Sequence, residues 1–248
     1  MGSIGSNLQE VKRRIETACE QAGRDAQLVT HVPSLSTGKA PGSSLTLLAV
    51  SKTFGADAVL AAIAQGQHAF GENYVQEALT KIDALTAQRA QLQWHLIGPL
   101  QSNKTRAVAE AFDWVHTVDR LKIATRLAEQ RPAGLAPLQL CLQVNISGEA
   151  SKSGVLPAEL PALAHAVAAL PPERVQLRGL MSIPEPQPGA DAAAQRRPHC
   201  LLRELLMALQ AHGLALDTLS MGMSADLEAA VAEGSTLLRV GSAIFGAR

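Results

Sequence analysis

Short apolar runs alternate with segments of helical periodicity over most of the chain, and this alternation constrains the fold more than any other feature. The predicted strands are residues 45–53, 68–72, 92–100, 114–119, 138–147, 175–183, 216–224 and 237–246. The predicted helices between them are residues 56–66, 73–88, 102–111, 120–131, 157–169, 190–212 and 226–234. Eight strands that alternate with helices in 248 residues predict an α/β fold, a (β/α)8 TIM barrel. A doubly wound open sheet has a similar rhythm and is the alternative.

Two segments lie outside this alternation. Residues 7–23 have apolar positions at helical spacing, with Asn7 as a candidate N-cap, and predict an extra helix after a flexible start at residues 1–6. The stretch 28–44 mixes Pro, Gly and Ser without a period and predicts a loop, with residues 31–44 as an insert. Pro198 predicts a kink or a break in the helix at 190–212. Because no shift in composition marks a boundary, we expect residues 1–248 to form a single domain.

Composition limits the partners and the compartment. The chain has 22 basic and 22 acidic residues, so no net field favours nucleic acid or a membrane surface. No apolar run approaches the roughly 20 residues of a spanning helix, and the start lacks the apolar segment of a secretory signal. Cys19, Cys141 and Cys200 are odd in number and far apart, which predicts reduced thiols. We therefore expect a cytoplasmic protein without nucleic-acid or membrane partners, and we also expect a monomer.

Lys52 is the most unusual polar residue at a predicted strand end. In TIM barrels the chemistry lies at the C-terminal ends of the strands, and most polar residues there are also ordinary helix caps. A lysine has no acceptor oxygen to cap a helix, and it adds positive charge where the helix dipole is already positive. Desolvation and nearby positive charge would both favour the neutral amine, which is the nucleophile in imine formation. Lys52 is therefore a candidate covalent residue.

The last two predicted strands end in glycine and serine. Gly222 and Ser224 precede the final predicted helix, while Gly241 and Ser242 follow Arg239 in the last strand. In TIM barrels the loops after strands seven and eight frequently form a phosphate site. Because a strand inside a barrel has no free edge, we expect Arg239 to point toward the barrel mouth. An amine, a phosphate cradle and a buried cation suit either pyridoxal phosphate or a sugar-phosphate aldolase that forms an imine.

Several motifs in order along the chain carry a resemblance to a known family. The motifs LLAVSKT, FGENYVQEA, WHLIGPLQSNK, VHTVDRLKIA, VNISGEASKSG, GLMSIP and LSMGMSADLEAAVAEGSTLLRVGSAIFGAR together resemble the YggS/PROSC family, the pyridoxal phosphate homeostasis proteins. The resemblance covers residues 7–248. The insert at 31–44 and the region of Pro198 depart from the family pattern, and neither touches a strand end.

The resemblance implies a barrel similar to the N-terminal domain of alanine racemase, with pyridoxal 5'-phosphate held as an internal aldimine on Lys52. It also implies that Ser224, Gly241 and Ser242 hold the phosphate. Arg239 would face the pyridine nitrogen, which makes the cofactor a weaker electron sink. The neighbours of the ring would be Asn73 and either Met181 or Ser182, and Lys104 is a candidate second amine.

Three functional classes follow. The resemblance implies a protein that stores, buffers or delivers pyridoxal phosphate without turnover, with pyridoxal phosphate-dependent apoenzymes as candidate recipients. The alternative is an amino-acid racemase of the alanine racemase type, which needs a second acid or base opposite the lysine. Tyr74 is the only tyrosine and the sequence ends just after the last strand, so we expect no efficient racemisation. An imine-forming aldolase is the third class.

We expect His95 and His116 to be core residues, and we expect no metal site.

Overall fold

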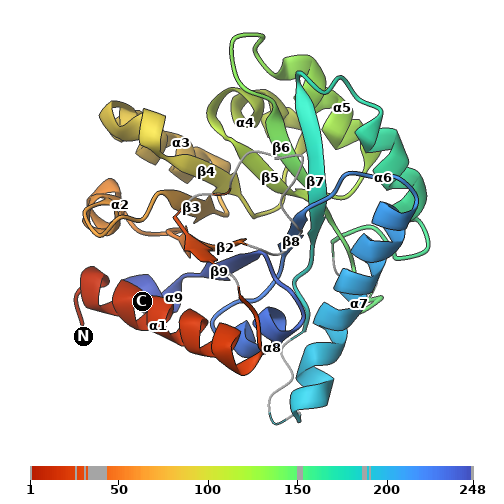
Figure 1. Cartoon of the computed structure of the whole chain (residues 1–248). Helices are drawn as coiled ribbons and strands as arrows, with labels where there is room; N and C mark the ends of the chain where they lie inside the picture. Colours follow the sequence, from red (N-terminus) through yellow and green to blue (C-terminus); the bar gives the residue numbers. More distant parts are fainter. Residues whose placement is uncertain are drawn as a thin grey trace.

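The computed structural model describes residues 2–25, 27–30, 32, 44–149, 153–185, 189 and 191–246. Its described residues form a nine-stranded parallel sheet that is surrounded by helices (Figure 1). The barrel strands are β2 (Ser44–Val50), β3 (Ala69–Glu72), β4 (Gln93–Leu96), β5 (Trp114–Val118), β6 (Leu138–Gln143), β7 (Val175–Met181), β8 (Thr218–Ser220) and β9 (Leu237–Val240). Because β2 pairs with β9, the sheet closes on itself. The predicted (β/α)8 barrel is confirmed, and the open sheet is excluded.

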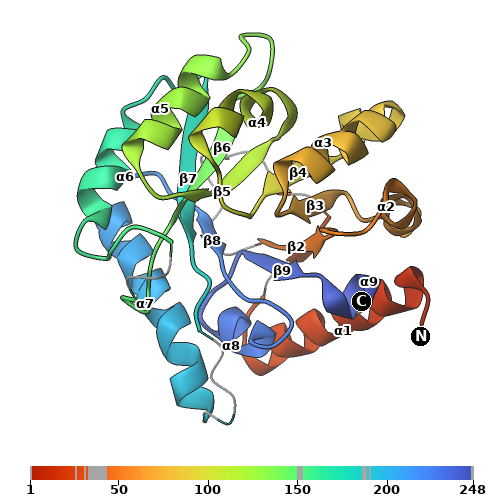
Figure 2. The same cartoon turned by 180° about the vertical axis from the view of Figure 1, so that it is seen from behind.

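Helices cover the outer face of the barrel (Figures 1 and 2). They are α1 (Ile4–Gln21), α2 (Ala56–Ile63), α3 (Val75–Ala84), α4 (Thr105–Ala111), α5 (Leu121–Gln130), α6 (Leu160–Ala168), α7 (Ala192–Ala211), α8 (Leu227–Ala232) and α9 (Ser242–Phe245). Two short 3₁₀ helices are η1 (Thr86–Gln91) and η2 (Ser102–Lys104). Helix α1 packs against α8 and α9, so both termini lie on the same side of the barrel (Figure 1). Within the described ranges, none of the helices has the length and apolarity that a bilayer span requires.

The strand β2 shows why these strands read as continuous apolar runs. Leu45, Leu47 and Ala49 belong to the large apolar cluster that includes helix residues, whereas Leu48 and Val50 belong to a second, smaller cluster. Successive side chains of a strand point to opposite faces, and in a barrel covered by helices both faces are buried. The whole strand from Leu45 to Val50 is therefore buried.

Three local predictions differ from the structure. Helix α1 begins at Ile4, and its N-cap is Ser3, whose Oγ accepts a hydrogen bond from the Ser6 amide at 3.2 Å. Asn7 is therefore not the cap, and residues 4–6 belong to the helix. Part of the predicted loop at 28–44 is a strand, because β1 (Gln27–Val29) pairs with the start of β2. The insert at 31–44 lies outside the described residues except for Val32 and Ser44.

Pro198 lies inside α7 without ending it, so of the two predicted outcomes the break is wrong and the kink stays a prediction. A proline removes one helical hydrogen bond, here the one to the carbonyl of Ala194. Leu202, Leu206 and Leu209 are buried along the following turns of α7, and their packing offsets that loss.

Candidate functional site

Lys52 lies in a turn just after β2, and its side chain is exposed. The N-cap of α2 is Gly55, three residues further on. Because the Lys52 side chain is exposed, the desolvation expected for its amine is not seen. The direction of this side chain is therefore set by the backbone conformation of the turn. The next residue, Thr53, has a φ of 68° and is the only non-glycine residue with positive φ among the residues described. A β-branched residue is strained in this region, so the surroundings must hold it there.

A buried ionic network lies against this turn. The Ser51 hydroxyl donates to Glu72 Oε1 at 2.6 Å, and Lys81 Nζ lies 2.7 Å from the same oxygen. Lys81 also donates to the Ser51 carbonyl at 2.7 Å and pairs with Glu77 at 2.8 Å. Glu77 Oε1 in turn accepts from the Thr53 amide at 2.5 Å. Burial raises the pKa of Glu72, against the hydrogen bonds from Lys81 and Ser51 that lower it. The residues on both sides of Lys52 are thus bound to the same network.

The sequence analysis did not identify this network. Glu72, Glu77 and Lys81 are spaced five and four residues apart, and the pair Glu77 and Lys81 reads as an ordinary helical i,i+4 pair. Only the observed burial of Lys81, which is 4% exposed, distinguishes it from a surface lysine.

Arg239 is buried with its guanidinium at the C-terminal ends of β7 and β8. Its Nη1 donates to the carbonyl and the hydroxyl of Ser220 at 2.6 and 2.7 Å, and its Nη2 donates to the Ser182 carbonyl at 2.8 Å. Burial lowers the pKa of Arg239 to about 10, so it remains a cation at neutral pH. A guanidinium has five N–H donors, and these contacts leave Nε–H and one Nη2 proton for another acceptor.

A chain of hydrogen bonds runs from Arg239 into the barrel interior. Ser220 Oγ lies 2.8 Å from His116 Nδ1, and His116 Nε2 lies 3.0 Å from His95 Nδ1. Because Arg239 donates to Ser220, the hydroxyl proton is free to point to His116, which then donates from Nε2 to His95. Burial lowers the pKa of His95 to about 3 and that of His116 well below its usual value. The prediction that both histidines are core residues is confirmed. Among the described residues no group of three His, Cys, Asp or Glu could hold a metal.

The glycine and serine loop after β9 lies beside the Lys52 turn. Gly241 precedes α9, and a Cβ at this position would lie 3.1 Å from the carbonyl of Val50, two residues before Lys52. Ser242 is exposed at the start of α9, and Ser224 is half-buried in the loop after β8. Gly222 has a φ of 94°, and a Cβ there would lie 2.6 Å from that of Ala230, so this turn requires glycine.

Helix α1 supports these loops. Arg14 Nη1 donates to the Ser224 carbonyl at 2.9 Å, while its Nε pairs with Glu228 at 2.6 Å. Asn7 Nδ2 donates to the Ile244 carbonyl in α9 at 2.9 Å. The sequence analysis missed these three contacts because they join residues more than 200 positions apart.

Three buried polar atoms near the C-terminal ends of the strands have no hydrogen-bond partner. They are Glu72 Oε2, Asn73 Oδ1 and Ser182 Oγ, at the ends of β3 and β7. A buried atom without a partner costs about 1–3 kcal/mol, so an atom of this kind is a candidate for completion by a water molecule or a ligand. Asn73 and Ser182 are two of the predicted neighbours of the ring, and Met181 is buried beside Ser182. Lys104 is half-buried in η2, in the loop after β4, and its role as a second amine stays a prediction.

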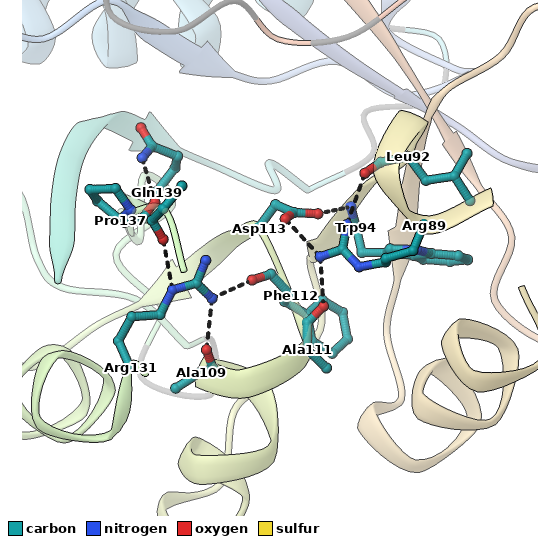
Figure 3. Close-up of polar contacts among 11 residues, drawn as sticks. Arg89, Leu92, Trp94, Ala109, Ala111, Phe112, Asp113, Arg131, Pro137 and Gln139 are labelled. Atoms are coloured by element: carbon teal, nitrogen blue, oxygen red, sulfur yellow. Dashed lines mark hydrogen bonds and ion pairs between the residues drawn. The ribbon is translucent and has the colours of Figure 1, made fainter. Parts of the chain in front are cut away.

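The opposite end of the barrel carries charged side chains whose partners belong to the chain itself (Figure 3). Arg131 donates to the carbonyls of Ala109, Phe112 and Ala136 at 2.7 to 2.8 Å. Arg89 donates to Asp113 at 2.8 Å, and Asp113 also accepts from the Trp94 amide at 2.8 Å. These contacts join the starts of β4, β5 and β6.

Comparison with known proteins identifies the family. The family model for the alanine racemase N-terminal domain matches residues 37–248. A pyridoxal phosphate homeostasis protein of Pseudomonas aeruginosa is 56% identical over 248 residues, which cover 100% of this chain and 97% of that protein. The chain belongs to the pyridoxal phosphate homeostasis family.

Solved structures agree with this membership. The structure of PipY from Synechococcus elongatus with pyridoxal phosphate bound has a TM-score of 0.76 and 36% identity, and the match covers 98% of this chain and 100% of that one. Alanine racemase from Corynebacterium glutamicum matches with a TM-score of 0.60 at 19% identity, over 97% of this chain and 59% of that one. The likeness of this family member to the racemase shows the fold alone.

Proposed function

We propose that this protein binds pyridoxal 5'-phosphate and serves its homeostasis by storing, buffering or delivering it, without turnover of its own. The observation that carries the proposal is the meeting of three features at one end of the barrel. These are the Lys52 turn, the Gly241 loop that packs against Val50, and the unpartnered oxygens of Asn73 and Ser182. Family membership and the ligand of the PipY structure support the same cofactor.

The residues at this end match the parts of the cofactor. When bound, the cofactor would supply an aldehyde carbon that is electrophilic toward an amine. Lys52 is the proposed anchor, and Ser224, Gly241 and Ser242 are the proposed phosphate residues. The start of α9 presents backbone N–H groups that lack intrahelical acceptors, which are suitable donors for a phosphate.

Arg239 is the proposed partner of the pyridine nitrogen. Its remaining N–H donors can occupy the nitrogen lone pair, and a guanidinium gives up its proton far less readily than a carboxylic acid. Arg239 would then leave the nitrogen without a proton of its own, and the bound cofactor would be a weaker electron sink. This favours binding over turnover. The racemase alternative has support only from the shared fold.

Chemical trapping tests the anchor. The purified protein is incubated with pyridoxal phosphate, reduced with borohydride and digested, and we expect a pyridoxyl mass on the peptide that contains Lys52. Lys52→Ala should lose this adduct completely, whereas Lys104→Ala, the matched control at the same end, should keep it. An adduct at another lysine, with the Lys52 peptide unmodified, would overturn the assignment.

Delivery and turnover are tested separately. The loaded protein should restore activity to a pyridoxal phosphate-dependent apoenzyme, and L-alanine should not be converted to its mirror image in its presence. Conversion that disappears in Lys52→Ala would establish the racemase instead.

The cytoplasmic location is proposed from the three free cysteines, and the monomeric state stays a prediction that sedimentation would check.

A further inference from the structure

Lys52 is flanked by two backbone groups that are held by one buried cation. The carbonyl of Ser51 accepts from Lys81 Nζ at 2.7 Å. The amide of Thr53 donates to Glu77 Oε1 at 2.5 Å, and Glu77 is itself paired with Lys81 at 2.8 Å. The residue before Lys52 and the residue after it are therefore both tied to Lys81, which lies on α3 and is 4% exposed.

The second tie holds a strained conformation. Thr53 has a φ of 68°, in the left-handed region, where the Cβ of a β-branched residue clashes with the backbone. Without constraints from its surroundings, we expect Thr53 to return to a negative φ. Glu77 is 31% exposed and would be free to change rotamer if it were alone. Its ion pair with the buried Lys81 keeps Glu77 Oε1 within hydrogen-bonding distance of the Thr53 amide. Lys81 therefore stabilises the strained turn indirectly, through Glu77.

A role in stability alone does not account for this arrangement. A buried ion pair can often be replaced by apolar residues without loss of stability, because the Coulombic gain is offset by desolvation. Here Lys81 contacts two carboxylates and a carbonyl. The carbonyl belongs to Ser51, and the two carboxylates accept hydrogen bonds from Ser51 and Thr53, the two neighbours of Lys52 in the chain. Strained non-glycine residues that are held by their surroundings are concentrated at functional sites.

We propose that Lys81, acting through Ser51 and Glu77, is a positioning residue that sets the backbone direction from which Lys52 reaches its carbonyl partner. This rests on the proposed function, in which Lys52 captures pyridoxal phosphate. A turn that is held in place before capture loses less conformational freedom on binding, which increases affinity.

Variants at Glu77 test the second tie, because this side chain is partly exposed and its replacement leaves the barrel core intact. Glu77→Ala removes the acceptor of the Thr53 amide, and Glu77→Gln keeps an oxygen there. We expect Glu77→Ala to weaken the capture of pyridoxal phosphate by about tenfold, the scale of a lost constraint on one strained residue. Capture is measured from the absorbance of the bound cofactor and from the pyridoxyl fraction at Lys52 after borohydride. Glu77→Gln should recover most of it.

Lys81→Met tests the cation itself, with Arg178→Met as the matched control. Arg178 is also buried and paired, with Asp217 at 2.6 Å, but it lies toward the opposite end of the barrel. We expect Lys81→Met to reduce capture at least tenfold and Arg178→Met to leave it unchanged at a temperature where both are folded. Adding Thr53→Gly to Lys81→Met should restore part of the capture, because glycine adopts positive φ without support.

The outcomes separate the two proposals. If the wild-type protein forms no adduct at Lys52, the proposed function fails. If the wild-type protein forms it and Lys81→Met and Glu77→Ala form it equally well, the positioning role is overturned while the proposed function stands. Equal losses in Lys81→Met and Arg178→Met would also overturn the positioning role, since they would show a general effect of removing a buried cation.

Discussion

The two ends of the barrel are formed by the same strands but differ in the hydrogen-bond partners of their polar side chains. At the N-terminal end, Arg131 binds three backbone carbonyls and Arg89 pairs with Asp113 (Figure 3). At the C-terminal end, Asn73 Oδ1 and Ser182 Oγ are buried without partners. Arg131 and Arg89 thus find their partners within the chain at one end, although Gln67 Oε1 and His68 Nδ1 before β3 also lack a partner. At the other end the unpartnered Ser182 hydroxyl lies next to Arg239, which keeps two N–H donors for another acceptor.

From this difference we expect the paired arginines at the N-terminal end to contribute to stability and the unpartnered oxygens at the C-terminal end to contribute to binding. A polar group that is already paired contributes to folding. An unpaired buried polar group destabilises the free protein by about 1–3 kcal/mol, and this cost is removed only when a ligand supplies the missing hydrogen bond. The strained Thr53 beside Lys52 belongs to the same pattern. Substitutions at the two ends should therefore have opposite signatures in unfolding and in binding.

The largest effect on stability is expected for Arg131→Met at the N-terminal end. The substitution removes the donors of three carbonyls, those of Ala109, Phe112 and Ala136, and should lower the free energy of unfolding by about 3–5 kcal/mol. Urea unfolding measures this loss. Capture of pyridoxal phosphate under folding conditions should not change. A parallel loss of capture in Arg131→Met would show that the two ends are not independent.

An intermediate effect is expected from the histidines between the two ends. Burial lowers the folded-state pKa of His95 to about 3 and that of His116 well below 6.5, and the charge of Arg239 also opposes protonation of His116. Below pH 6.5 the unfolded chain therefore takes up two protons that the folded chain does not. Stability should fall as the pH is lowered, by about 2 kcal/mol between pH 6.5 and 5.5.

Unfolding by urea at several pH values measures this slope. His95→Gln removes one of the two titrating groups and keeps an acceptor for His116, so the slope between pH 6.5 and 5.5 should fall to about half. An unchanged slope in His95→Gln would show that other groups cause it.

The smallest effect on stability is expected at the C-terminal end. Ser182→Ala removes a buried hydroxyl that has no partner, so the free energy of unfolding should not fall and should rise by about 1 kcal/mol, whereas capture should weaken several-fold. Ser51→Ala is the matched control, because Ser51 is equally buried but donates to Glu72. It should lower stability by about 1–2 kcal/mol. A larger loss of stability in Ser182→Ala than in Ser51→Ala would contradict the contrast.

The candidate site was predicted from the sequence only as far as strand ends allow. Once the barrel is recognised, Lys52, Asn73, Ser182 and the glycine loops must lie at one end, because all parallel strands point the same way. Lys81 could not be found in this way. Its contacts with Ser51, Glu72 and Glu77 depend on how α3 packs against β2 and β3, which no local pattern encodes.

The sequence by itself determined the alternation of strands and helices, because strand and helix periodicities report local backbone preference and burial over several residues. Elements without a period were beyond it, such as β1, which has three residues. The closure of the sheet into a barrel was decided by the pairing of β2 with β9. Tertiary structure alone decided which polar atoms find partners and that Lys52 is exposed while Lys81 is buried. The physical reason is that the pairing of polar groups depends on the packing of segments far apart in the chain, whereas residue spacing depends on neighbours.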